Sequence, residues 1–443
     1  MPLPHDTAIA LGVERNGVNF RHCHSRSLML DRLANPALDK DDRRDFFLNA
    51  FKKPPVRDRL PAWQSFLSSV VGLSAEAILF AQLQSRLMVN KAGGVMENAG
   101  LCLDRFGVPY IPGSAVKGCA RRMAIQNLLE AREAKEPADE LGRLLADIAL
   151  VFGWGEQDWK LKSDLKPRRS ETDEQFQKRW EQERSDFSYA CAEALWPQIQ
   201  EGVRTRLCAK LQCKEFPTSF AGSVSFLPAY PHELPANDLE LDVLTCHHGE
   251  YYSLNPAYDT APDTEEPVPV IFPAVSPGKG TEQDRSVFAF AVLPLRGERN
   301  SVSQPGIKLH GLARGWLSKS LTTFGIGAKA AAGYGWFVAD DVLQKTVRAS
   351  IERSARRPDP ALLAELRGWT DKQVRTAARP FMFQNAVSWP KTGREAEDNY
   401  QFTLVTFILK EKAPLFLAEK NHAGSDFAKG VKRLAEKFQL KLP

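Results

Sequence analysis

The 443-residue chain lacks the features of membrane-spanning, secreted and disordered proteins. No run approaches the ~20 apolar residues that a membrane-spanning helix needs. The first twenty residues lack a basic stretch followed by an apolar one, so no secretory signal is indicated and we expect a cytoplasmic location. The content of 43% hydrophobic and 26% charged residues is that of a soluble globular protein.

Cysteine is scarce, and the seven residues are scattered along the chain. An odd, dispersed set favours reduced thiols over a disulfide framework. Zinc sites need paired ligands at short spacing, and neither His22-Cys23-His24 nor the pair Cys208 and Cys213 fits a zinc-finger spacing. We therefore expect no structural metal and no other cofactor.

Two nucleotide-binding motifs are also absent, although a glycine-rich segment, GIGAKAAAGYG, lies at 325–335. A dinucleotide fingerprint needs G-x-G-x-x-G between a strand and a helix, whereas here Ala330 replaces the third glycine and a predicted helix precedes a predicted strand. A Walker loop needs lysine after its last glycine, but Cys119 follows Gly118. The segment is either a flexible turn of small residues or a loop whose backbone amides contact phosphate.

Positive charge is modest and unevenly placed. The chain has 59 Lys and Arg residues against 54 Asp and Glu, a net charge of +5. Residues 346–443 hold 18 basic and 11 acidic residues, a net charge of +7, so the rest of the chain carries −2. The segment 155–186 is highly charged but nearly balanced, which favours a solvated helical insertion over a nucleic-acid patch.

Hydrophobic patterning predicts an α+β protein. The expected elements are a strand at 78–89, a helix at 114–150 broken near Pro137, strands at 222–231, 239–252 and 287–293, a helix at 308–324 and a strand at 336–340. The Pro-rich, acidic segment 255–273 is expected to be a loop. The central order of strand, helix, strand, strand, helix, strand is that of the ferredoxin-like or RNA-recognition fold.

The same pattern divides the chain into three regions. They are a lead-in at 1–75, a ferredoxin-like domain at 76–345 with a helical insertion at about 151–220, and a basic C-terminal extension at 346–443. Within the extension we expect helix to about Arg379, a strand at 401–409 and a final basic helix at 427–440.

A polar group of residues lies at the start of the helix predicted from 114. Ser114 is expected to cap this helix, and Ser114, Lys117 and Arg121 fall within about 60° of one face. A hydroxyl, an ammonium and a guanidinium near free helix amides could track a sugar-phosphate backbone. A solvated helix face would show the same pattern.

Together, two segments resemble the signatures of a known family. PYIPGSAVKGCARR at 109–122 resembles the IPGSSLKGALR signature of the RAMP proteins (repeat-associated mysterious proteins) of CRISPR systems, and GIGAKAAAGYGWF at 325–337 resembles their glycine-rich signature. The intervening text is similar to the family of sixth subunits of the type III-B Cmr effector complex. The resemblance covers about residues 25–340. It departs at Leu227, where an aspartate is usual, and leaves the tail unexplained.

The resemblance implies a non-catalytic subunit that binds crRNA toward the 3′ end of the guide and helps to hold the guide–target RNA duplex in antiviral defence. Its partners would be crRNA, complementary target RNA and other RAMP subunits, with no membrane. The residues expected to bind RNA are Arg86, Lys91, Ser114, Lys117, Arg121, Gly325, Gly327, Lys329, Gly333, Tyr334 and Gly335. Cations would neutralise phosphates, loop amides would donate to them, and the tyrosine could stack on a base or ribose.

Two alternatives remain. One is an endoribonuclease for crRNA precursor or target RNA, in which His247 and His248 with Asp242 act as acid and base on a 2′-hydroxyl. The other is a structural cap whose tail binds a protein partner.

Overall fold

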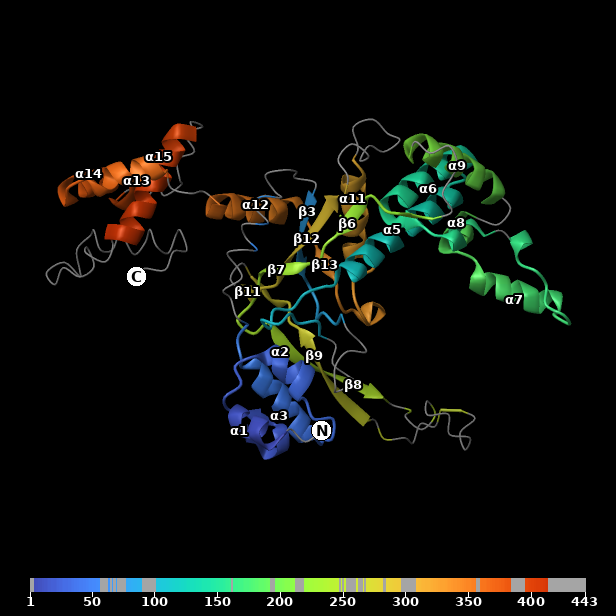
Figure 1. Cartoon of the computed structure of the whole chain (residues 1–443), viewed down its shortest axis with the longest axis horizontal. Coiled ribbons are helices and arrows are strands. Elements are labelled where there is room, and N and C mark those ends of the chain that lie inside the picture. The colour runs from blue at the N-terminus through green and yellow to red at the C-terminus, as the bar shows by residue number, and fades with distance from the viewer. Residues whose placement is uncertain are drawn as a thin grey trace. The chain divides into compact units, whose positions relative to one another are not determined.

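The computed structural model (Figure 1) divides into two compact units, Met1–Ala349 and Ser350–Pro443. Helices and strands both build the first unit, which confirms the predicted α+β class. The structure describes residues 4–55, 63, 66, 69, 77–89, 101–160, 162–191, 196–211, 219–246, 248, 251, 260–261, 266, 268–281, 284–295, 308–355, 359–383 and 395–412. None of the helices in these ranges combines the length and apolarity that crossing a membrane requires.

A five-stranded antiparallel sheet lies at the centre of the first unit. Its strands are β3 (Ile78–Leu83), β6 (Val224–Phe226), β7 (Tyr230–Glu233), β12 (Val287–Pro294) and β13 (Phe337–Val338). The strand order is β13-β3-β12-β6. Both β6 and β7 pair with the same edge of β12, β7 near the start of that strand and β6 near its end. The strand predicted at 78–89 therefore ends at Leu83. β12 is buried on both faces from Val287 to Val292, as its continuous apolar run predicts.

Two long helices cover one face of this sheet. They are α5 (Gly113–Glu133) and α11 (Leu309–Thr323), which pack against each other. Leu79, Ala81 and Leu83, alternate residues of β3, join the same core cluster as residues of both helices. The helix predicted at 114–150 is two helices, α5 and α6 (Ala138–Phe152), which are separated before Pro137 as expected.

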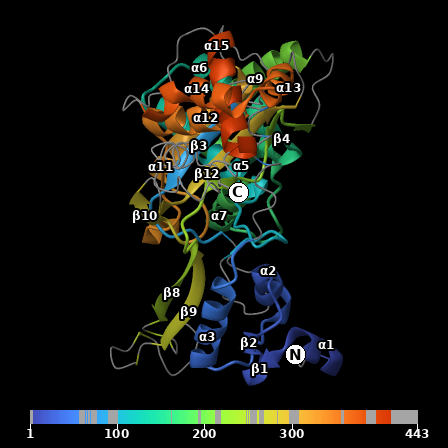
Figure 2. The same ribbon diagram turned by 90° about the vertical axis from the view of Figure 1, so that its left-hand side faces the viewer.

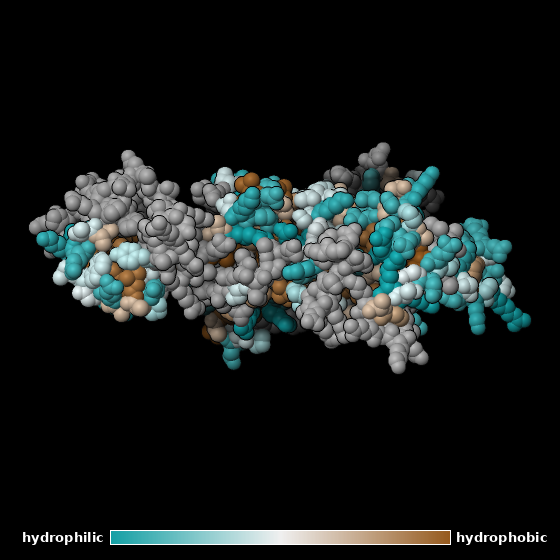
Figure 3. Space-filling model, turned by 90° about the horizontal axis from the view of Figure 1, so that it is seen from above, coloured by the Kyte–Doolittle hydropathy of each residue, from teal (hydrophilic) through white to brown (hydrophobic). Residues whose placement is uncertain are grey.

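Helices also fill the chain between α5 and β6. Besides α6 they are α7 (Asp173–Glu183), α8 (Asp186–Cys191) and α9 (Trp196–Leu211). A stacked aromatic pair, Trp154 and Phe187, with ring centroids 4.9 Å apart, packs α8 against the short strand β4 (Gly153–Trp154). The outer end of this insertion, around α7, has a largely hydrophilic surface (Figure 3). Most of its charged residues therefore lie at the surface rather than in the core.

The N-terminal elements lie beside a long hairpin (Figure 2). These elements are α1 (His5–Leu11), β1 (Val13–Glu14), β2 (Asn19–Phe20), α2 (Arg26–Leu28) and α3 (Lys40–Phe51). The hairpin consists of β8 (Leu239–Cys246) and β9 (Val268–Val275), so the loop predicted at 255–273 is wrong where it overlaps β9. Arg26 is 1% exposed and donates to both carboxylate oxygens of Asp238, 2.8 and 2.5 Å away. This buried pair fixes α2 at the base of β8.

The helix after β13 covers part of a sheet edge. β13 pairs with Gln82 and Leu83 of β3, and no strand in the described part of the chain covers this edge beside Phe80. In α12 (Asp341–Ala355) the Gln344 side chain accepts a hydrogen bond from the Phe80 amide, 3.0 Å away, and donates one to the Phe80 carbonyl. One amide side chain thus replaces a strand partner and protects the edge.

The second unit is helical where the structure describes it. Its elements are the end of α12, then α13 (Pro360–Arg367), α14 (Asp371–Phe383), α15 (Glu395–Phe407) and a π-helical turn at Ile408–Lys412. The strand predicted at 401–409 is wrong. All residues from Thr403 to Leu409 are buried, and a buried helix shows the same continuous apolar run as a buried strand. The helix predicted at 427–440 lies outside the described residues.

Candidate nucleic-acid interface

The two signature segments, 109–122 and 325–337, meet in space at the C-terminal end of α11. The Cys119 thiol on α5 lies 3.2 Å from Ser320 Oγ and 3.7 Å from the Gly325 carbonyl oxygen. The Arg122 guanidinium lies 4.1 Å from the centre of the Phe324 ring, directly before the glycine-rich loop. The segments are therefore neighbours on one surface although about 200 residues separate them in sequence.

The start of α5 depends on glycine rather than on a serine cap. The helix begins at Gly113 with Pro112 at the N-cap position, so the prediction that Ser114 caps it is wrong. A Cβ atom at Gly113 would overlap the carbonyl oxygen of Phe226. Glycine therefore lets the helix begin against β6, and the Ser114 side chain stays exposed in the first turn.

The cations of α5 are compensated to different extents. Arg121 donates to Asp186 of α8, 2.5 Å away, and lies over the Phe187 ring. Lys117 is half-buried, and burial together with the charge of Arg121 lowers the pKa of its ammonium. Among the described residues neither Lys117 nor the exposed Arg122 has a carboxylate partner. The α5 surface, defined as Ser114, Lys117, Gly118, Arg121 and Arg122, therefore carries an excess of positive charge.

Sequence reasoning missed Arg122. Such reasoning considered only Ser114, Lys117 and Arg121, which share one arc of the helix face. The sequence spacing could have indicated Arg122. It lies four residues after Gly118, and residues four apart are neighbours on a helix surface.

The glycines of the loop at 325–335 have two roles. Gly325, Gly327, Gly333 and Gly335 all have φ between 67° and 98°, which side chains rarely adopt. A Cβ atom at Gly327 would overlap the Met88 carbonyl, and one at Gly335 would overlap the Ile326 carbonyl. A Cβ atom at Gly333 would meet nothing within 4 Å. Three of these glycines therefore allow close backbone packing, while Gly333 serves only the turn.

Most amides of this loop already donate within the protein. The amides of Ala328 and Gly335 donate to the carbonyls of Met88 and Arg86, at 2.6 and 2.8 Å. These two hydrogen bonds attach the loop to the segment that follows β3. Ile326, Ala332, Gly333, Tyr334 and Trp336 also donate internally. Within the described part of the chain, the amides left without an acceptor are those of Gly327, Lys329, Ala330 and Ala331. Few of the predicted amide donors thus remain for a phosphate, and they lie at the tip of the loop.

Two residues predicted to bind RNA are held by carboxylates of β8. Arg86 donates to Glu240 Oε1 at 2.7 Å and to Asp242 Oδ2 at 3.1 Å. The Tyr334 hydroxyl donates to the same Asp242 oxygen. Burial and this hydrogen bond raise the pKa of Tyr334 to about 12. Burial alone would raise the pKa of Asp242, but the bonds from Tyr334 and the Val243 amide and the charge of Arg86 lower it below its usual value.

The carboxylate partners were also missed, and only part of the signal was in the sequence. Glu240 and Asp242 are two residues apart in a strand, so they lie on one face. Nothing in the sequence indicates that this face meets Arg86, which precedes Glu240 by 154 positions.

Lys329 differs from Arg86, because it has no ion-pair partner among the described residues. Its backbone is left-handed, with φ 58°, and its ammonium lies 4.8 Å from the centre of the Phe272 ring of β9. Phe272 also contacts the ring of Tyr334, at 6.1 Å. The loop tip therefore offers one uncompensated cation and an aromatic pair. Lys91 lies outside the described residues.

The residues suggested for catalysis are not assembled where the structure describes them. Asp242 is engaged by Arg86 and Tyr334, and His247 lies outside the described residues. Within the described ranges no three His, Cys, Asp or Glu side chains are grouped as a metal site requires.

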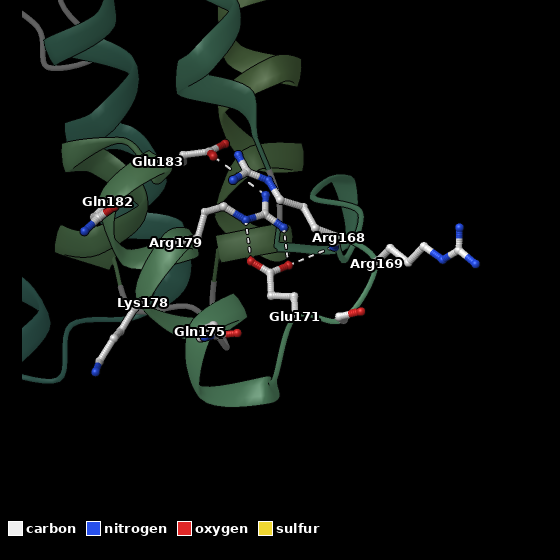
Figure 4. A pocket seen from close by; sticks show the side chains of 9 residues that line it. Arg168, Arg169, Glu171, Gln175, Lys178, Arg179, Gln182 and Glu183 are labelled. Atoms are coloured by element: carbon white, nitrogen blue, oxygen red, sulfur yellow. Dashed lines mark hydrogen bonds and ion pairs between the residues drawn. The ribbon is translucent and has the colours of Figure 1, made fainter.

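A separate pocket of about 540 Å³ lies in the insertion (Figure 4). Arg179 forms a two-pronged ion pair with Glu171, at 2.8 and 2.7 Å, at its centre. The side chains of Arg169 and Lys178 point away from this pair. Glu171 therefore compensates the charge of Arg179, and Arg169 and Lys178 do not point toward this pair.

Comparison with known proteins finds similarity to subunits of CRISPR Cmr systems. Subunit Cmr6 of the CRISPR Cmr system of Pyrococcus furiosus is 28% identical over 260 residues, which are 58% of this chain and 65% of that protein. The match thus spans just under two thirds of the relative's length. The crystal structure of Pyrococcus furiosus Cmr6 is 23% identical, with a TM-score of 0.27 over 59% of this chain and 96% of that one. A chain of the type III-B Cmr-β complex bound to cognate target RNA is 15% identical, with a TM-score of 0.34 over 70% of this chain and 77% of that one.

The family match covers both signature segments. The model of the RAMP superfamily matches residues 90–338, which is more than half of the chain. The segments that it covers include the start of α5 and the glycine-rich loop, which meet at the end of α11. The chain belongs to the RAMP superfamily.

Proposed function

We propose that the protein is a Cmr6-like, non-catalytic RNA-binding subunit of a type III-B CRISPR effector complex. Sequence similarity to Cmr6 over 260 residues supports the choice of subunit. The observation that carries RNA binding is that the two RAMP signatures meet and leave Lys117, Arg122 and Lys329 without carboxylate partners among the described residues. Uncompensated cations on one surface suit the phosphates of an RNA backbone.

The proposed core is ferredoxin-like. The elements β3, α5, β6 with β7, β12, α11 and β13 follow one another in the order strand, helix, strand, strand, helix, strand. The sheet order β13-β3-β12-β6, with antiparallel pairs throughout, supports this topology. Both signature segments then lie at the ends of its two helices, because one begins α5 and the other follows α11.

The proposed ligands are crRNA and its complementary target RNA, and the proposed neighbours are other RAMP subunits of a cytoplasmic complex for antiviral defence. Within the complex the subunit would lie toward the 3′ end of the guide. Sequence specificity would come from base pairing, because backbone contacts carry no base information. The protein would hold the shape of the guide rather than cleave it.

Salt-dependent binding tests this proposal. Single-stranded RNA of about 20 nucleotides, labelled at one end, is titrated with the full-length chain at several salt concentrations. Lys117→Ala combined with Lys329→Ala should weaken binding and reduce the slope of log K against log salt by about one to two, because each phosphate contact contributes about 0.7 for single strands. Arg169→Ala with Lys178→Ala removes two exposed cations of the insertion and is the matched control. Equal slopes for both double variants would contradict the proposed interface.

Catalysis is tested separately. The full-length chain with labelled RNA and divalent metal should give no cleavage. Site-specific products that disappear in His248→Ala would support the endoribonuclease instead.

A further inference from the structure

Gly118 of α5 is a glycine that the folded chain does not require. It lies inside the helix, is exposed, and has no positive φ. A Cβ atom built there would meet nothing within 4 Å, unlike one at Gly113, which would overlap the Phe226 carbonyl. Glycine inside a helix is less favourable than alanine because it loses more backbone freedom on folding. Among the described residues, neither packing nor backbone conformation compensates this loss.

The surroundings of Gly118 indicate what could approach it. Ser114 and Arg122 lie four residues before and after Gly118, so the three form one row on the helix, and Lys117 and Arg121 flank this row. Lys117 and Arg122 have no carboxylate partner among the described residues, and Asp186, which pairs with Arg121, is exposed. Gly118 is thus a bare stretch of main chain between a hydroxyl and several cations. Such a surface fits an anionic group that comes close to the helix backbone.

We propose that a phosphodiester of bound RNA packs directly against the α5 main chain over Gly118, between the Ser114 hydroxyl and the Arg122 guanidinium. This inference rests on the proposed RNA-binding function and adds to it a contact surface that a side chain would block. The cations attract the phosphate, and the missing Cβ lets it come within their reach. A methyl group at 118 would keep every charge and still weaken binding.

Gly315 provides a matched control on α11. It is also exposed inside a helix, and a Cβ atom there would likewise meet nothing within 4 Å. The neighbouring cations differ, because Arg314 donates to the Ile78 carbonyl at 3.1 Å and Lys319 lies 3.4 Å from Glu130. Gly315 therefore has the same steric freedom without the uncompensated charge.

The experiment compares Gly118→Ala, Gly118→Leu, Gly315→Ala and Gly315→Leu in the full-length chain. Alanine and leucine are strong helix formers, so all four variants should have a Tm equal to or above that of the wild type. For the labelled 20-nucleotide RNA, Gly118→Leu should raise Kd about tenfold, the size of one lost charge-assisted contact. Gly118→Ala should raise it less, and neither Gly315 variant should change it.

The outcomes separate this inference from the proposed function. Wild-type protein that does not bind the RNA would overturn RNA binding itself, and the inference with it. Wild-type binding with an unchanged Kd for Gly118→Leu would overturn the inference alone. An equal loss in Gly315→Leu would also overturn it, because the effect would then not depend on the row of residues at Gly118.

Discussion

On the α5 surface, Lys117 and Arg122 have no carboxylate partner among the described residues, whereas at the glycine-rich loop Arg86 is held by Glu240 and Asp242. The glycines of the two regions also differ in how closely other atoms approach them. Gly118 leaves its helix bare, whereas a Cβ atom at Gly335 would overlap a carbonyl of its own loop. Much of the loop's signature therefore holds the fold, whereas the α5 surface is where we propose that RNA binds. A motif shared by a family therefore need not be a ligand contact at every position.

The largest effect is expected at Gly335. Gly335→Ala forces a side chain into φ 67° and into the Ile326 carbonyl, so it should lower the free energy of unfolding by about 3 kcal/mol or more. Gly333→Ala has a similar φ of 90° but open space around the added methyl, so the loss should be about 1 kcal/mol. Urea unfolding of both variants measures the difference. Equal losses would mean that backbone conformation alone, and not the close approach to the Ile326 carbonyl, requires the glycine at 335.

Removing one cation from each region should affect different properties. Lys117→Ala should leave the Tm near the wild-type value and reduce the salt slope of RNA binding by about one. Arg86→Ala should leave that slope nearly unchanged and lower the stability by about 1 kcal/mol, because Glu240 and Asp242 lose their partner. Thermal unfolding and RNA titration of the two variants give the test. A fall in slope for Arg86→Ala as large as that for Lys117→Ala would place Arg86 at the RNA despite its ion pairs.

The link between Tyr334 and Asp242 predicts a pH dependence. The pKa of Tyr334 is raised to about 12 in the folded chain, so the folded state holds this proton more tightly than the unfolded state, in which the pKa is about 10. The resulting stability is complete below pH 10 and is lost as the pH rises toward 12. Urea unfolding at pH 9 and at pH 11 should show this loss in the wild type and a smaller one in Tyr334→Phe. The same loss in both proteins would assign the alkaline effect to other groups.

The sequence predicted the elements well where one periodicity prevailed. The alternating and continuous apolar runs of β3 and β12 and the long helices α5 and α11 follow from local pattern, and the order of these elements suggested the fold. The pattern failed for α15, because the run from Thr403 to Leu409 is buried on all sides and helix and strand then look alike. Length and burial, which only the folded chain reveals, decide such a case.

The sequence could indicate cations of the candidate site but not how their charges are compensated. Lys117, Arg121 and Lys329 lie within the two signature segments, and their binding to RNA stays a prediction. The sequence did not show that Arg121 pairs with Asp186, or that the Arg86 carbonyl accepts the Gly335 amide. These are contacts between positions that only the fold brings together, so local spacing cannot report whether a cation is free or compensated.

The smallest effects are expected in the insertion, which serves as the neutral reference for both regions. Arg169 and Lys178 are exposed and point away from the Arg179–Glu171 pair (Figure 4). Arg169→Ala and Lys178→Ala should each change the free energy of unfolding by less than about 0.5 kcal/mol, because exposed ion pairs such as Lys178 with Glu174 contribute little. Their salt slopes for RNA should equal that of the wild type. A reduction of the slope by about one in either variant would mean that RNA binding follows the total positive charge. It would contradict the view that binding depends on the cations of the α5 surface and the loop tip.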